Sequence, residues 1–120
     1  MQDRQRSKWQ LYTTASGSDV VSKEIREVLQ GRPPRLELGN LMQRIEDGRT
    51  LRRDTKHLGK GLHEARLTHE TNEYRLYYAV NPQGEHLLLG LKFHMKGGSG
   101  AQDRAVEVAR DRLAEWQSRI

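Results

Sequence analysis

Cysteine is absent from this sequence of 120 residues, so the chain forms no disulfide and offers no thiolate to a metal ion. Long apolar runs are also absent. The leucine run at Leu87–Leu89, with Leu91 and Phe93 nearby, is far shorter than the roughly 18 residues that a membrane span needs. The basic residues near the start are followed by no apolar stretch of the kind a secretory signal has. We therefore expect a cytoplasmic protein without membrane contact.

Apolar residues are scarce as well, at 34% of the chain, whereas charged residues make up 31%. This length and composition suit one domain with a modest hydrophobic core. We expect that domain to cover residues 1–120, with the polar residues 1–7 frayed at the start.

The common signatures of catalysis and cofactor binding are missing too. The chain has neither the GxxxxGK[ST] pattern of a phosphate-binding loop nor a GxSxG nucleophile turn. No two of the histidines are spaced four apart, as a helical metal site would need; they are His57, His63, His69, His86 and His94. We expect no metal and no cofactor.

Positive charge is what the chain has in excess, with a formal net charge of +5 and an isoelectric point of about 9.8. The excess lies in the middle: residues 49–66 contain six lysines and arginines against Asp54 and Glu64. By contrast, residues 103–119 hold four charges of each sign. A basic balance of this kind favours a polyanionic partner such as RNA, DNA or an acidic protein.

Periodicity predicts the first half of the chain as one strand followed by two helices. Residues 9–14 are rich in strand-forming residues and are followed by Gly17. A helix is expected from Ser18 or Asp19 to about residue 30, and a second one from the two prolines at 33–34 to Gly48.

Three strands and a helix are expected in the second half. The strands cover residues 62–68, 73–80 and 86–95, with a turn at residues 81–84 between the last two. After a glycine-rich break at 97–100, a helix runs from about residue 101 to the end, with an apolar stripe that includes Trp116 and Ile120. The fold class is therefore α+β, in the order β-α-α-β-β-β-α. We expect an antiparallel or mixed four-stranded sheet with helices on one face.

Alternation along these strands divides their side chains between two faces. The expected core face of the last strand carries Leu87, Leu89, Leu91, Phe93 and Met95. The other face of the sheet gathers Glu64, Arg66, Arg75, Tyr77, Lys92, His94 and Lys96. Such a face could bind a phosphate backbone, because arginine offers forked donors to phosphate oxygens. It could equally be a solvated face held by cross-strand ion pairs, such as one between Glu64 and Arg75.

Four segments in order resemble a known family. They are Trp9 to Val21, Lys56 to Arg66 (KHLGKGLHEAR), Tyr74 to Tyr78 (YRLYY) and Leu87 to Lys96 (LLLGLKFHMK), followed by a helix rich in alanine and arginine. This pattern is similar to the phage-derived Gp49-like group of the RelE/HigB toxin superfamily, over about residues 9–116. The resemblance implies a small curved sheet with helices and a metal-independent, ribosome-dependent cleavage of messenger RNA. In that reaction the ribose 2′-hydroxyl attacks the adjacent phosphate.

The resemblance also implies roles for individual residues. Arg75 matches the family arginine that contacts the scissile phosphate, and Lys96 matches the second lysine of the F-x-K-K motif. Arg66 and Lys56 match the basic residues that end and open the K-x-L…E-x-R run. The chain departs from the pattern in two segments: Met95 replaces the first lysine of F-x-K-K, and the first hairpin strand has Leu62 and Glu64 where some relatives have lysines. The lysines that usually supply the general base are therefore absent.

The resulting site hypothesis assigns Arg75 and Lys96 to the scissile phosphate and His94 to proton transfer, with Glu64 as the alternative. Tyr77 is expected to stack on a base. The remaining RNA-binding candidates are Arg53, Lys56, Arg66 and Lys92.

The resemblance further implies a cognate antitoxin, usually a helix-turn-helix protein encoded by an adjacent gene. Two other functions stay open from the sequence. One is a non-catalytic module or phage accessory protein that acts on a protein partner such as gyrase. The other is a nuclease that acts on free RNA.

Overall fold

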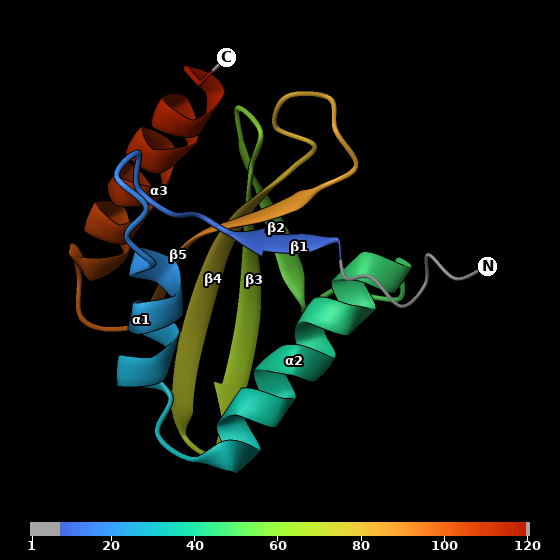
Figure 1. Cartoon of the computed structure of the whole chain (residues 1–120). Helices are drawn as coiled ribbons and strands as arrows, with labels where there is room; N and C mark the ends of the chain where they lie inside the picture. The colour runs from blue at the N-terminus through green and yellow to red at the C-terminus, as the bar shows by residue number, and fades with distance from the viewer. Residues whose placement is uncertain (1–7, 120) are drawn as a thin grey trace.

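The computed structural model describes residues 8–119, so the expectations for residues 1–7 and for Ile120 lie outside the described part. The chain is α+β, as predicted (Figure 1). Its elements are β1 (Trp9–Leu11), α1 (Val20–Val28), α2 (Arg32–Asp47), β2 (Thr55–Gly59), β3 (Leu62–His69), β4 (Asn72–Val80), β5 (Leu88–Met95) and α3 (Ala101–Gln117).

The sheet has five strands in the order β1-β5-β4-β3-β2, rather than the four expected. β1 runs parallel to β5, and the other neighbouring pairs are antiparallel, so the sheet is mixed. The additional strand is β2, which forms a hairpin with β3 through a turn at residues 59–61. All three turn residues have positive φ, at 89° for Gly59, 53° for Lys60 and 81° for Gly61. A five-residue strand without apolar alternation gives little periodic signal, which is why β2 escaped prediction.

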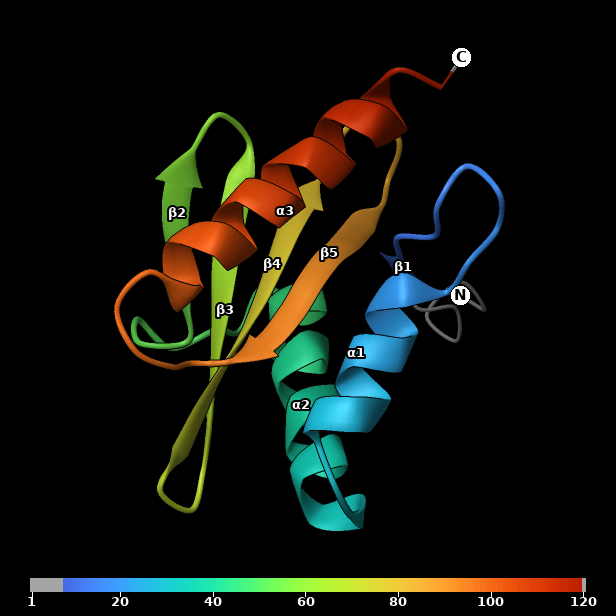
Figure 2. The same ribbon diagram turned by 90° about the vertical axis from the view of Figure 1, so that its left-hand side faces the viewer.

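Helices cover both faces of the sheet, and the expectation of helices on one face is wrong. α3 lies across one face and α2 across the other, while α1 lies along β5 (Figures 1 and 2). The burial of β4 follows from this arrangement: its six residues from Tyr74 to Ala79 are all buried, on both sides of the strand. None of the helices in residues 8–119 has the length and apolar character needed to cross a bilayer.

A bulge in the pairing of β4 with β5 changes which side chains share a face. Tyr77 pairs with Lys92, but Tyr78 pairs with Gly90, so Leu91 is an extra residue in β5. Phe93, opposite Leu76, therefore points to one face, and Leu89, opposite Ala79, points to the other. Strict alternation, which put Leu89, Leu91, Phe93 and Met95 on a single core face, is wrong here, and Met95 is half exposed. Both faces of β5 are nevertheless buried over most of its length.

Candidate nucleic-acid interface

The polar residues predicted to share one sheet face do share it. Cross-strand pairing places Glu64 opposite Tyr77 and Arg66 opposite Arg75 in β3 and β4. Arg75 is in turn opposite His94, and Tyr77 is opposite Lys92, in β4 and β5. Directly paired residues project to the same side of an antiparallel sheet. This side is the one that α3 covers, because Gln102 of α3 donates to Glu64.

Glu64 is the buried centre of the cluster, with 1% of its surface exposed. Its carboxylate accepts hydrogen bonds from Nε of Arg66 at 2.8 Å and from Nε2 of Gln102 at 2.9 Å. Nε of Arg75 lies 3.5 Å from Oε2 of the same carboxylate, so the predicted ion pair between Glu64 and Arg75 is confirmed. Two guanidinium groups are thus held side by side by one buried negative charge.

Arg75 is itself buried and makes contact with a second carboxylate. Its Nη1 donates to the main-chain oxygen of Tyr74, and its Nη2 donates to Oε1 of Glu73 at 3.0 Å. Nζ of Lys96 lies 3.9 Å from that same oxygen. The hydrogen bond from Arg75, reinforced by the charge of Lys96, lowers the pKa of Glu73. The two residues predicted to hold a phosphate are therefore brought together, with the carboxylate of Glu73 between them.

An open cavity of about 570 Å³, here called the arginine cavity, lies beside this group, between α2, the connection from α2 to β2, and the β3–β4 hairpin. Its charged lining residues are Glu37, Arg44, Arg53, Asp54, Arg66, Glu73 and Arg75. Arg44 forms a two-point hydrogen bond with Asp54, at 3.1 and 3.2 Å. Burial raises the pKa of Asp54, but the hydrogen bonds from Arg44 and from the main chain of Leu51 outweigh it and hold the pKa below its usual value.

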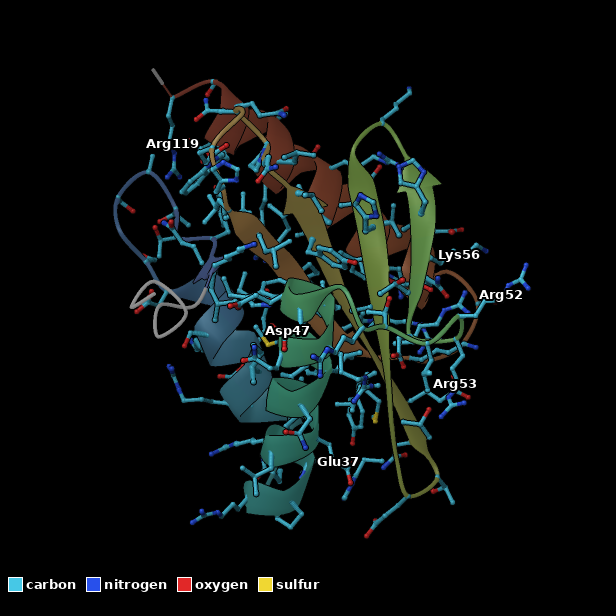
Figure 3. All side chains as sticks on the ribbon, turned by 90° about the vertical axis from the view of Figure 1, so that its right-hand side faces the viewer. Glu37, Asp47, Arg52, Arg53, Lys56 and Arg119 are labelled. Atoms are coloured by element: carbon cyan, nitrogen blue, oxygen red, sulfur yellow. The ribbon has the colours of Figure 1, made fainter. Side chains whose placement is uncertain are left out.

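Cations without an acidic partner continue from this cavity onto the surface. We call them the basic edge: Arg49, Arg52, Arg53, Lys56 and Lys60, all exposed on the α2–β2 connection and the β2 hairpin. Within residues 8–119 none of the five forms an ion pair. Figure 3 shows Arg52, Arg53 and Lys56 pointing outward at the β2 side of the molecule. Arg53 belongs to both groups, so the basic edge leads into the arginine cavity.

Lys92 and Tyr77 are less accessible than the sequence suggested. Nζ of Lys92 lies 3.1 Å from the carboxylate of Glu24, which Arg112 also contacts at 3.0 Å. The ring of Tyr77 is fully buried, so the structure does not support its expected role of stacking on an RNA base. It lies instead against the ring of His94, with centroids 5.5 Å apart and a 3.0 Å hydrogen bond between the Tyr77 hydroxyl and Nε2 of His94.

His94 borders a different space from Arg75. It lines a smaller concavity of about 230 Å³ under the start of α3, together with Lys92 and Arg104. Burial, assisted by the positive charges of Lys92 and Arg75, lowers the pKa of His94, so the imidazole is neutral near pH 7. The predicted proton-transfer residue is therefore adjacent to Arg75 along the sheet but outside the arginine cavity.

No protein-family model and no curated protein matches the chain.

Several residues of the interface were not among the predicted site residues. Alternation does place Glu73 on the same face as Arg75, but a carboxylate was not expected inside a phosphate site. Arg44 and Gln102 come from α2 and α3, and the sequence did not indicate where those helices dock on the sheet. Across residues 8–119, no three histidine, aspartate or glutamate side chains gather as a metal site would require.

The arrangement can hold an anion by charge and by directed hydrogen bonds. Arg75 has a planar, forked guanidinium that is fixed by burial, and its Nε has no hydrogen-bond partner within residues 8–119. The contact with Glu73 occupies Nη2, but Glu73 is half exposed and lies at the cavity wall, so its side chain can rotate away. A phosphate that displaced Glu73 would gain both Arg75 and Lys96.

Proposed function

We propose that this protein is the toxin of a type II toxin–antitoxin system, which binds messenger RNA on the ribosome in the cytoplasm and cleaves it. The observation that carries the proposal is the row of unpaired cations leading into a cavity lined by Arg75 and by Glu73, a displaceable carboxylate that Lys96 also approaches. Unpaired cations in a row are what a phosphate backbone requires. The sequence resemblance to RelE/HigB toxins points to the same residues.

The proposed chemistry is attack by a ribose 2′-oxygen on the adjacent phosphorus, with departure of the 5′-oxygen of the next nucleotide. The phosphate would replace Glu73 as the partner of Arg75 and Lys96, and these two cations would stabilise its developing charge. His94 is assigned to accept the 2′-hydroxyl proton, because its lowered pKa leaves it neutral near pH 7. Arg53, Lys56 and Arg66 would position the flanking backbone.

The test is a cell-free translation reaction with purified ribosomes, read by primer extension on ribosome-bound and ribosome-free messenger RNA. We expect the wild-type protein to stop translation and to produce cuts only when ribosomes are present. Arg75→Ala should abolish the cuts, whereas Lys23→Ala, an exposed change on α1, should retain them. An Arg75→Ala protein that still stopped translation and cut ribosome-bound message would refute the assignment. Cuts in ribosome-free RNA would instead indicate a nuclease of free RNA.

A toxin of this type also requires an antitoxin. We propose a small helix-turn-helix protein encoded by a neighbouring gene. Its co-expression should restore growth to cells that the present chain arrests.

A second function is favoured by one specific observation. Arg75 is held by two carboxylates, and the arginine cavity is lined by no histidine. A cavity without a histidine to transfer protons could bind a partner without catalysing a reaction. The protein would then be a binding module that acts on another protein, such as gyrase. Growth arrest without RNA cleavage, accompanied by loss of DNA supercoiling activity, would favour this second function.

A further inference from the structure

A second cavity, of about 310 Å³, lies on the α2 side of the sheet, at the C-terminal end of that helix. We call it the aromatic cavity. Its lining includes Thr50, Thr55, His63, Tyr78 and His86, with apolar walls from the end of α2 and from β4 and β5. None of the residues assigned to the proposed reaction lines it.

Four rings lie next to one another across the sheet at this point. The rings of His63 and Tyr78 are stacked, with centroids 5.2 Å apart and planes 23° apart. His57 meets His63 edge-on at 4.7 Å, and Trp9 meets Tyr78 edge-on at 5.3 Å. His57 is exposed and His63 is half-buried, so the row of four rings is open to solvent on the β2 side. A row of flat side chains of this kind can accept a further ring by stacking.

Two polar side chains of this cavity, those of Tyr78 and His63, form no hydrogen bond within residues 8–119. Tyr78 is only 4% exposed, but its hydroxyl is not among the buried unpaired atoms of residues 8–119 and is therefore accessible. Burial raises the pKa of Tyr78 to about 12, so this hydroxyl is a donor at neutral pH. The imidazole of His63 also has no hydrogen-bond partner in that part of the chain. Burial and the neighbouring His57 lower the pKa of His63, which leaves it uncharged and able to stack near pH 7.

The aromatic cavity and the arginine cavity are separated by the most basic segment of the chain. Ile45 and Thr55 line the aromatic cavity, and their sequence neighbours Arg44 and Asp54 line the arginine cavity. Residues 49–53, which carry three arginines of the basic edge, connect these positions. A strand of nucleic acid that crosses this segment can therefore reach both cavities.

We propose that the aromatic cavity is a subsite for one base of single-stranded RNA whose phosphates lie on the basic edge. The proposal rests on the RNA binding proposed above and adds a base-recognition site on the opposite face of the sheet. The base would stack on His63 and accept a hydrogen bond from Tyr78. A base fits better than an apolar peptide segment, because flat rings, unpartnered polar atoms and adjacent unpaired cations occur together.

The experiment compares a fluorescein-labelled ten-nucleotide oligoadenylate with inorganic polyphosphate, a polyanion without bases. Binding is measured by fluorescence anisotropy, directly for the RNA and by competition for polyphosphate. His63→Leu keeps apolar volume but removes the ring, and Tyr78→Phe keeps the ring but removes the hydroxyl. The matched control is His69→Leu, the same change on the same strand at a residue paired with Glu37, outside this cavity. Circular dichroism melting shows whether each variant is folded.

We expect His63→Leu to weaken oligoadenylate binding about fivefold or more, since stacking of one base contributes about that much. Its affinity for polyphosphate should stay unchanged, and His69→Leu should bind both ligands like the wild type. Equal RNA affinity of His63→Leu and wild type would overturn the subsite while leaving RNA binding intact. No preference of the wild type for RNA over polyphosphate would overturn the subsite together with the proposed RNA binding.

A measurement on the wild-type protein covers the case in which His63→Leu does not fold. The ring-proton NMR signals of His63 should shift on addition of oligoadenylate and stay in place on addition of polyphosphate. Identical responses to the two ligands would exclude a base in this cavity.

Discussion

Nη2 of Arg75 donates a hydrogen bond to the carboxylate of Glu73, two residues earlier on the same face of β4, at 3.0 Å. Lys96 approaches the same oxygen from the end of β5. A carboxylate therefore lies between the two cations that the proposed function assigns to a phosphate, and it competes with any anion that enters the arginine cavity.

Removing the charge of Glu73 should therefore tighten RNA binding. Glu73→Gln leaves a side chain of the same size that holds Arg75 and Lys96 less strongly, and we expect a several-fold gain in affinity for single-stranded RNA. Fluorescence anisotropy at constant salt measures it. Glu70→Gln, on the neighbouring turn, removes the same charge from an exposed residue outside the cavity and is the control. Equal affinities for the two variants would show that Glu73 does not occupy the anion site.

The pairing of Arg75 with Glu64 predicts a loss of stability that is separate from any loss of activity. Arg75→Ala leaves Glu64 buried with one cation fewer, and breaking a buried ion pair costs about 3 kcal/mol of unfolding free energy. The double variant Glu64→Gln, Arg75→Met removes both charges and should recover most of that stability. Urea unfolding measures both values. A double variant that is stable but does not cleave RNA would show that the loss of activity comes from the removed charged groups rather than from misfolding.

The basic edge should determine how strongly RNA binding depends on salt. Replacing Arg52, Arg53 and Lys56 by alanine removes three cations that form no ion pair with any residue from 8 to 119. The fold should therefore be retained while the contacts of these cations with the RNA phosphates are lost. The slope of log affinity against log salt should become shallower by about 2 for single-stranded RNA. Alanine at Lys23, Arg26 and Arg32 removes the same charge from α1 and the start of α2 and should leave the slope unchanged. Similar slopes for both triple variants would mean that only net charge matters.

The lowered pKa of His94 predicts loss of stability on mild acidification. The folded state holds the neutral imidazole, whereas the unfolded chain protonates with the ordinary pKa near 6.5. The contribution of His94 to stability is therefore complete above that pH and declines as the pH falls toward the lower folded pKa. His94→Gln cannot be protonated and can still bond to the Tyr77 hydroxyl, so its unfolding free energy should vary less between pH 7 and pH 5. If the unfolding free energy of His94→Gln varied with pH as strongly as that of the wild type, His94 would not be neutral in the folded protein. His63, which has a lowered pKa as well, contributes the remaining dependence in both proteins.

The sequence predicted the class of fold and the composition of the charged sheet face, because both depend on local periodicity. Glu64, Arg66, Arg75, Tyr77, Lys92 and His94 share a face as alternation required. Alternation failed beyond Tyr77, where the bulge shifts β5 by one residue, since a bulge depends on how two strands pair rather than on either strand alone. The near-continuous apolar runs at residues 76–80 and 87–91 are typical of strands buried on both faces, and they indicated the double helical cover that we did not expect.

The site residues were predicted less well than the fold, for a related reason. Periodicity shows which side chains share a face but not what covers that face. Tyr77 therefore appeared available for stacking and is fully buried, and Lys92 appeared free and is paired with Glu24 of α1. Arg53 and Lys56 remain exposed, as a role in RNA binding requires. The aromatic cavity could not be anticipated, because it depends on where α2 ends above the sheet and on the β2 strand that the sequence did not reveal.

The parallel pairing of β1 with β5 has a consequence for how the protein is made. Trp9 pairs with Leu88, so β1 joins a strand that is synthesised about 80 residues later. A nascent chain cannot complete its sheet until β5 has left the exit tunnel, and closing so long a loop adds an entropic cost. If the chain acts on ribosomes as proposed, this delay keeps the growing polypeptide inactive toward the ribosome that is translating it.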